Sequence, residues 1–166
     1  MTPVADPSFE TIDPEATVET VDPGYLQSLI GFNARMAALK VIESVLPRLS
    51  PHGLRIVDFS VLSLIRHNPG ITSRQLCDAL NLLPPNLVGK IGAFEKRGLL
   101  VRHPHPQDGR ALGLHLTAEG GALMAQAEQT VLDTENQVAT ALTSAERRTL
   151  IRLLQKVYCS GDGEAP

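Results

Sequence analysis

Residues 71–102 read ITSRQLCDALNLLPPNLVGKIGAFEKRGLLVR, and this stretch decides the fold. It begins with Thr72, which is followed three residues later by Gln75. Such a pair forms a capping box, in which two side chains satisfy the free amides at the start of a helix. We therefore expect a first short helix that begins after Thr72 and ends at about Leu80.

A second helix is expected shortly afterwards. Pro84 and Pro85 suit its first turn, where a proline costs no helical hydrogen bond. Its apolar residues recur at i, i+4 and i+7 and so share one face: Leu87, Ile91 and Phe94. Gly98 is placed as the helix stop. Two short helices joined by a tight turn indicate a helix-turn-helix.

Two strands are expected directly after this pair of helices, at residues 99–103 and 112–116. The second strand alternates leucine with Gly113 and His115, which is the period of a half-buried strand. Residues 104–110 are rich in proline, aspartate and glycine and are interpreted as the turn of a hairpin. A helix-turn-helix followed by such a hairpin is a winged helix-turn-helix.

Helical patterns also precede this unit. Apolar residues recur at helical spacing from Tyr25 onward, until Pro51 and Gly53 interrupt the pattern near residue 49. A further helix, apolar nearly all round and therefore buried, is expected over residues 56–67.

Two more helices are expected downstream of the hairpin. Thr117 can cap a long helix that ends near Ala141. Thr143 and Glu146 form another capping box, which predicts a last helix. The inward residues of that last helix recur at helical spacing: Leu150, Leu153, Leu154 and Val157.

The sequence thus predicts a mainly α-helical protein with a small β-wing, in which N- and C-terminal dimerisation helices flank a winged helix-turn-helix. The expected segments are a flexible acidic arm with several prolines, a dimerisation helix, the DNA-binding region, two C-terminal dimerisation helices and a flexible tail: 1–23, 24–53, 54–117, 118–159 and 160–166. The flanking helices carry more apolar surface than one copy can bury. A second copy of the chain is the simplest cover for it.

Composition fits a cytoplasmic protein, and the distribution of its charge, unlike the net charge, is compatible with DNA binding. The chain has 166 residues, enough for one ordinary domain, and a formal net charge of −3. Residues 1–24 hold six acidic and no basic residues, so the remainder has a net charge of +3. No apolar run approaches the roughly 18 residues of a membrane span. The first ten residues do not resemble a secretory signal, and two cysteines are too few for a disulfide framework.

Residues 53–120 resemble the MarR family of transcription regulators. The resemblance rests on residues 71–76 (ITSRQL), on LVGKI and EKRGLLVR at 87–91 and 95–102, and on DGR and LHLTAEG at 108–110 and 114–120. With the flanking helices it extends over about residues 25–158. It implies a triangular homodimer with two winged-helix lobes, which represses transcription from a pseudo-palindromic operator in double-stranded DNA. It also implies that a small aromatic or phenolic ligand releases the protein from DNA.

The resemblance implies a role for the tip of the wing. Arg110 occupies the position at which family members send an arginine into the minor groove, whose negative potential favours it. Asp108 would orient Arg110 or the nearby backbone through a charge-assisted hydrogen bond. The alternative is an Asp–Arg pair on the surface that merely stiffens the turn.

The second helix of the helix-turn-helix is expected to lie in the major groove. Its inward stripe leaves the opposite face toward DNA: Pro85, Asn86, Gly89, Lys90 and Ala93. Asn86 could pair with an adenine edge, and Lys90 with a guanine or a phosphate. Ordinary solvated surface is the alternative for both residues.

Two glycines depart from what a helix favours. Gly89 and Gly92 lie inside the expected recognition helix, where each costs about 1 kcal/mol relative to alanine. They indicate either a close approach of the helix backbone to DNA or a helix that stiffens on binding. Both interpretations predict few direct base contacts, with DNA shape supplying part of the specificity.

Phosphate contacts are expected from other positions. Ser73 and Arg74 lie at a helix start, where hydroxyl, charge and helix dipole can bind a phosphate together. Thr72 and Gln75 beside them are assigned to capping. Lys96 and Arg102 are also expected to contact phosphate groups.

A site for the effector is expected near the hinge between the dimer body and the DNA-binding lobe. Arg35, His52 and Arg55 supply cationic groups there, and the apolar walls would come from three other side chains: Phe32, Met36 and Phe59. An arginine or a protonated histidine would hold the carboxylate of a small aromatic acid, with the ring against the apolar wall. Alternatively, Arg35 is a solvated surface group and His52 a turn residue.

Other functions are weighed against this one. His103, His105 and His115 could converge on the hairpin, but no cysteine or carboxylate with ligand spacing accompanies them, so neither a metal nor a cofactor is expected. A thiol-based redox sensor that uses Cys77 stays an alternative, although no cluster of basic residues surrounds it. The other alternative is a winged-helix module that binds protein. Salt-dependent binding of duplex DNA would distinguish a DNA-binding protein from such a module. No phosphate loop, nucleophile elbow or zinc-protease motif indicates an enzyme.

Overall fold

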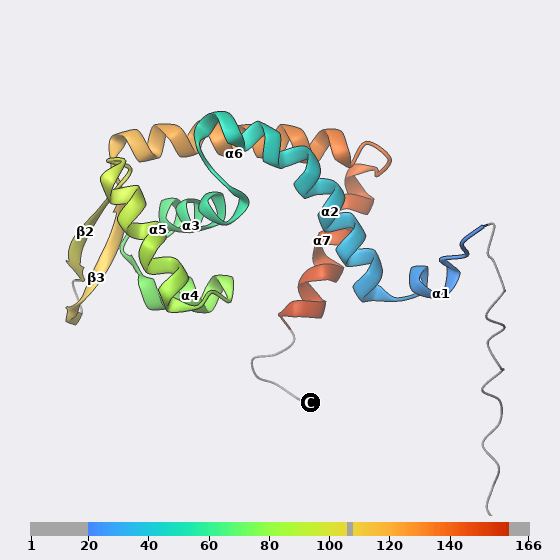
Figure 1. Ribbon diagram of the computed structural model, residues 1–166, viewed down its shortest axis with the longest axis horizontal. Coiled ribbons are helices and arrows are strands. Elements are labelled where there is room, and N and C mark those ends of the chain that lie inside the picture. Colours follow the sequence, from blue (N-terminus) through green and yellow to red (C-terminus); the bar gives the residue numbers. More distant parts are fainter. Residues whose placement is uncertain (1–19, 106–107, 160–166) are drawn as a thin grey trace, which may run out of the picture. The chain divides into compact units, whose positions relative to one another are not determined.

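The computed structural model describes the backbone of residues 20–105 and 108–159, and the side chains of these residues except 105 and 108–111. The chain divides into two units, residues 1–36 and residues 37–166. Figure 1 shows the arrangement of the elements, whose order in the chain is α1 (Gly24–Gln27), α2 (Ile30–Leu49), the 3-10 helix η1 (Ser50–His52), α3 (Ile56–His67), β1 (Ile71–Thr72), α4 (Ser73–Leu80), α5 (Pro84–Lys96), β2 (Leu100–His105), β3 (Asp108–Leu116), α6 (Ala118–Val138) and α7 (Ser144–Tyr158). Among the described residues, no helix is long and apolar enough to cross a membrane.

The first unit contains α1 (Gly24–Gln27) and the beginning of α2 (Ile30–Leu49). A single helix was expected here, but the structure interrupts it at Ser28 and Leu29. The side-chain amide of Asn33 donates to the carbonyls of Gln27 and Leu29, at 2.7 and 2.8 Å. The Leu29 carbonyl also accepts from the backbone amide of Asn33 at 3.2 Å, so the Asn33 side chain links the last residue of α1 to the start of α2.

The second unit contains the winged-helix lobe. Its helices are α3 (Ile56–His67), α4 (Ser73–Leu80) and α5 (Pro84–Lys96). Both caps expected from the sequence are present: the Thr72 hydroxyl accepts from the amide of Gln75, and the Gln75 side chain accepts from the amide of Thr72. Gly98 has φ of +69° directly after α5, as a helix stop requires.

A three-stranded antiparallel sheet completes the lobe, in the order β1-β3-β2. β2 (Leu100–His105) and β3 (Asp108–Leu116) form the wing, and residues 104, 105 and 108–110, which the sequence analysis placed in the turn, lie in these strands. β1 (Ile71–Thr72) was not expected, because two residues carry no strand period. It pairs with β3 through Ile71 and Leu114.

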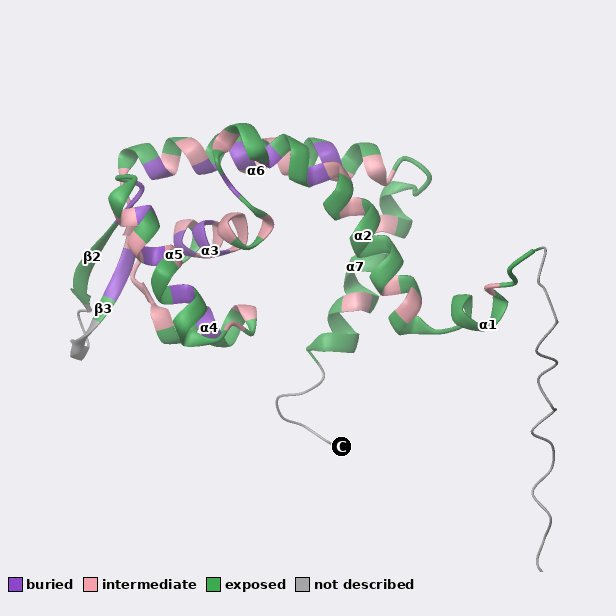
Figure 2. Cartoon of the chain, viewed as in Figure 1, coloured by how far each residue is buried: buried purple, intermediate pink, exposed green. Residues whose placement is uncertain are grey.

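The core of the lobe is closed. Figure 2 shows buried residues on α3, α4, α5, β3 and α6, and these residues belong to one hydrophobic cluster. The fully buried side chains come from every one of these elements: Leu62, Ile65, Leu76, Leu87, Ile91, Leu114 and Met124. The three residues predicted to form the inward stripe of α5 are all buried, which confirms how that helix is oriented.

The long helix α6 (Ala118–Val138) begins against the wing. The Thr117 hydroxyl accepts from the amide of Gly120 and donates to the carbonyl of Gly98 at 2.7 Å. A Cβ added at Gly120 would lie 2.1 Å from the carbonyl oxygen of Leu99. Only glycine therefore allows the first turn of α6 to pack against the backbone of Leu99, the residue before β2.

The last helix, α7 (Ser144–Tyr158), begins at the predicted capping box of Thr143 and Glu146. The Arg147 guanidinium contacts Asn136 and, at 3.4 Å, the carboxylate of Glu135 on α6. None of the residues of α7 is buried, and most of Figure 2's view of this helix is coloured as exposed.

Candidate nucleic-acid interface

Helix α5 has one buried and one exposed face. Four of the five residues that the sequence analysis assigned to the DNA side are exposed: Pro85, Asn86, Gly89 and Ala93. Lys96 in the last turn of α5 is exposed as well. Val88 is exposed as well, to 64%. The outward face of α5 is thus small and apolar along most of its length.

Lys90 does not extend outward with the rest of this set. Its ammonium donates to the Asp58 carboxylate on α3 at 2.6 Å, and both side chains are mostly buried. Asp58 also accepts from the backbone amide of Arg55 at the start of α3, at 3.0 Å. The pair therefore ties the middle of α5 to the first turn of α3.

The two glycines of α5 have no explanation within the chain. A Cβ added at Gly89 or at Gly92 would meet nothing within 4 Å. Neither Gly89 nor Gly92 has a positive φ. Alanine would fit both positions and would favour the helix, so any need for glycine comes from a molecule outside the chain.

The start of α4 lies beside α5. Arg74 is exposed and Ser73 half-buried, and both border a hollow of about 460 Å³ between the two helices. Cys77 also lines this hollow, with 8% of its surface exposed. Ser73 and Arg74 are therefore available at the edge of the helix-turn-helix, next to its exposed helix.

The wing holds the remaining predicted contacts. Asp108 and Arg110 lie in β3, but their side chains fall outside the described part of the structure. Arg102 on β2 forms a fork with the Glu95 carboxylate on α5, at 2.7 and 2.8 Å. This hydrogen bond lowers the pKa of Glu95 and raises the pKa of Arg102. The Arg102 guanidinium is thus engaged within the lobe, whereas Lys96 is exposed.

Two sets of polar contacts that hold the lobe in place were not predicted from the sequence. The Arg97 guanidinium donates to the carbonyls of Gly53 and His52, at 2.9 and 3.2 Å. Gly53 itself has φ of +64°, a conformation that glycine adopts without strain. The end of α5 is thereby attached to the turn that precedes α3.

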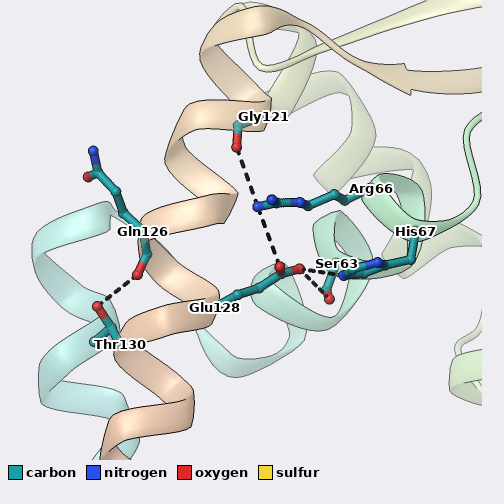
Figure 3. A network of polar contacts seen from close by, with 7 residues as sticks. All are labelled: Ser63, Arg66, His67, Gly121, Gln126, Glu128 and Thr130. Atoms are coloured by element: carbon teal, nitrogen blue, oxygen red, sulfur yellow. Dashed lines mark hydrogen bonds and ion pairs between the residues drawn. The ribbon is translucent and has the colours of Figure 1, made fainter.

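The second set of polar contacts involves Glu128 on α6. Figure 3 shows its carboxylate between three side chains from the end of α3. Ser63 donates to it at 2.9 Å, Arg66 lies at 3.4 Å and the His67 ring nitrogen at 3.1 Å. Arg66 also reaches the carbonyl of Gly121 at 3.5 Å. These contacts fix α3, and with it the lobe, to the middle of α6.

Two histidines of the wing contact each other. The rings of His103 and His115 meet edge to face with centroids 5.1 Å apart. Within the described residues, no group of three or more histidine, cysteine or acidic side chains could hold a metal ion. His105 lies outside the residues whose side chains are described.

A narrow apolar cleft of about 180 Å³ lies between α2, α3 and α6. Phe59, which the sequence assigned to the effector wall, lines it together with residues of all three helices: Val41, Ile42, Val45, Ile56, Ser60, Val131 and Glu135. None of these described lining residues is basic. His52 is half-buried in the turn before α3, Arg55 is exposed at the start of α3, and Arg35 belongs to the first unit.

Comparisons with known proteins agree with this architecture. Residues 52–111 match the model of the MarR family. The HTH-type transcriptional repressor Rv2887 of Mycobacterium tuberculosis is 31% identical over 109 residues, which are 66% of this chain and 78% of the repressor. The structure of that protein in complex with salicylic acid superposes with a TM-score of 0.64 at 28% identity, over 78% of this chain and 96% of the other.

Two further structures are similar over most of their length. The transcriptional repressor CouR bound to a 23-mer DNA duplex has a TM-score of 0.76 at 34% identity, over 83% of this chain and 98% of that one. CouR from Rhodococcus jostii RHA1 bound to p-coumaroyl-CoA has a TM-score of 0.75 at 27% identity, over 85% and 98% of the two chains.

Proposed function

This chain belongs to the MarR family of transcriptional regulators, and we propose that it acts as a homodimer whose two α5 helices enter the major groove of a pseudo-palindromic operator. Family membership makes it a DNA-binding regulator rather than an enzyme. The observation that carries the proposal is the division of α5 into a buried face and an exposed face with small residues. A helix of this kind fits the major groove, which is wide enough to admit one.

The proposed contacts follow from the positions described above. Ser73 and Arg74 bind phosphate from the start of α4, and Lys96 does so from the end of α5. Asn86 reads a base edge, and Arg110 at the wing enters the minor groove beside Asp108. Lys90 reaches DNA only if it gives up its ion pair with Asp58, so its first role is to position α5.

The homodimer is proposed from apolar residues that the chain leaves uncovered. On the part of α2 in the second unit, three large apolar side chains are exposed: Leu39, Ile42 and Leu46. On α7 the exposed set is larger: Leu150, Ile151, Leu153, Val157 and Tyr158. Monomeric proteins rarely expose such continuous apolar surface. A twofold dimer covers each patch with residues of the second copy.

The proposed effector is a small aromatic acid, whose ring lies in the cleft beside Phe59. The proteins that resemble this chain include one solved with salicylic acid and one with p-coumaroyl-CoA, both of which carry an aromatic ring. The cleft offers apolar walls but no basic side chain among its described lining. The carboxylate is therefore assigned to a cation outside the cleft, for which His52 and Arg55, which belong to the same unit as the cleft, stay the candidates.

The test of the effector is calorimetry with a panel of benzoates and cinnamates, with and without operator. A ligand that releases the protein must bind the DNA-free form more tightly, by a coupling of typically 1–3 kcal/mol. Phe59→Ala should abolish binding, whereas the Val57→Ala variant of the same helix should bind normally. If no acid of the panel binds, or if binding leaves operator affinity unchanged, the effector proposal is wrong.

The test of DNA binding is selection of duplexes from a random pool, followed by titrations at several salt concentrations. The selected sites should contain two half-sites about 34–36 Å apart, and affinity should fall steeply with salt. Lys96→Ala should lower the salt slope by about one. Lys40→Ala removes a similarly exposed lysine from α2 and should leave the slope unchanged. A chain that selects no common duplex sequence would contradict the proposal.

A further inference from the structure

Val88 is one of the two most exposed large apolar residues that the structure describes between residues 54 and 117. It is 64% exposed, on the second turn of α5, in a lobe whose other apolar residues mostly lie in a closed core. Exposure of a β-branched residue there gains nothing for the fold. The explanation is to be found in whatever α5 contacts.

The cations near α5 are mostly engaged inside the lobe. Lys90 is paired with Asp58, Arg97 with the carbonyls of the turn before α3, and Arg102 with Glu95. On the exposed face of α5 this leaves Asn86 and Lys96 as polar side chains, beside Val88 and two glycines. A helix that read guanines through basic side chains would have those side chains free.

The major groove itself offers one apolar group, the C5-methyl of thymine. The side chain of a valine in a helix is nearly fixed at χ1, so its two methyl groups form a rigid apolar surface. Gly89 and Gly92 lie beside Val88 and carry no Cβ, and space at both positions is open. At these two positions after Val88, no side chain therefore holds Val88 away from the floor of the groove.

We propose that Val88 contacts the methyl group of a thymine in each operator half-site and so determines a base preference of this regulator. The inference rests on the proposed function, because it requires α5 to lie in the major groove. It assigns specificity at one base pair to an apolar contact rather than to a hydrogen bond.

The experiment uses the full-length protein and its selected operator, in which each thymine in turn is replaced by deoxyuridine. Deoxyuridine lacks the methyl group and keeps every hydrogen-bonding group of thymine. At one thymine per half-site the replacement should weaken binding about fourfold, the value of one methyl group removed from water. The two half-sites together should then lose about 15-fold.

Val88→Ala should bind the thymine and deoxyuridine operators with equal affinity, and Val57→Ala, an exposed valine of α3, should keep the difference. The thermal midpoint and sedimentation of Val88→Ala should match those of the wild type. If the protein selects an operator but no deoxyuridine replacement distinguishes wild type from Val88→Ala, the inference is wrong while the proposed function stands. A change in oligomeric state in Val88→Ala would also overturn it, since Val88 would then belong to a protein contact. If no duplex is selected, the proposed function itself fails.

Discussion

In the winged-helix lobe the apolar faces of α3, α4 and α5 close on one another, whereas the apolar face of α7 stays open. Leu62, Ile65 and Leu87 are fully buried within a single chain. Leu150 and Leu153 of α7 have a similar helical spacing, yet they are 42% and 48% exposed. The same amphipathic pattern thus serves two purposes. In the lobe it specifies a fold, and on α7 it indicates a surface that needs a second molecule.

The largest effect is expected from a charge placed on the open apolar face of α7. Leu153→Asp should dissociate the dimer, because each copy then buries a carboxylate where a leucine contributed about 1.5–3 kcal/mol. A twofold interface counts the change twice, so association should weaken by about 3–6 kcal/mol. Analytical ultracentrifugation measures this directly.

Gln155→Asp is the matched control, since it adds the same charge to a polar position of α7. It should leave the dimer intact. A Leu153→Asp chain that still sediments as the wild type would remove α7 from the interface. So would a wild-type chain that is a stable, folded monomer.

The second prediction concerns the closed packing of the winged-helix lobe. Gly120→Ala forces a Cβ against the carbonyl of Leu99, which is backbone and cannot rotate away. Overpacking of this kind costs about 1–3 kcal/mol, and occasionally more. The free energy of unfolding should fall accordingly in denaturant titrations.

Gly121→Ala is the control for this prediction, because an added Cβ there meets nothing within 4 Å. It should be neutral or stabilising, since alanine favours a helix more than glycine does. Equal effects of the two substitutions would mean that α6 does not pack against Leu99 as described.

The local elements of the lobe could be predicted from sequence because their signals are local. The boundaries of α3 are those expected, Ile56 and His67, and the capping boxes at Thr72 and Thr143 are both present. The strand β1 could not be predicted, since Ile71 is defined as a strand only by its pairing with Leu114.

The site was predicted less completely, for the same reason. A stripe along α5 identifies its buried face, but the partner of Lys90 lies 32 residues away and that of Arg97 lies 44 residues away. No spacing within one helix reveals such pairs. Val88 was overlooked because an apolar residue beside a core stripe is ordinarily assigned to the core.

The third prediction concerns the exposed face of α5, where the needs of folding and of binding oppose each other. Gly89→Ala should stabilise the lobe by about 1 kcal/mol, because alanine favours a helix and the position is open. The same substitution should lower operator affinity if DNA approaches the helix backbone at this point. Thermal unfolding and operator titration, measured on one preparation, should therefore change in opposite directions. A variant that gains stability and binds operator as tightly as the wild type would show that Gly89 does not face DNA.

The last prediction concerns how the stability of the lobe and that of α7 depend on pH, and its expected effects are small. Arg102 lowers the pKa of Glu95 in the lobe, and Thr143 lowers the pKa of Glu146 at the start of α7, both from an ordinary value near 4.5. A carboxyl whose folded pKa lies below its unfolded pKa contributes stability above the unfolded value. That contribution is lost as pH falls through the folded pKa. The stability contributed by Glu95 and that contributed by Glu146 should therefore decrease below about pH 4.5.

Glu95→Gln should therefore lower the unfolding free energy of the lobe at neutral pH, by under about 1 kcal/mol for an ion pair this exposed, and the difference from wild type should vanish on acidification. Glu146→Gln should leave the lobe unchanged and instead weaken the start of α7, which sedimentation at low protein concentration would register as easier dissociation at neutral pH. Because the Glu95 pair joins α5 to the wing and the Glu146 cap lies on α7, each variant should alter one measurement and not the other. If Glu146→Gln destabilised the lobe as much as Glu95→Gln does, the lobe and α7 would unfold as one unit, and the closed core would not be independent of the open helix.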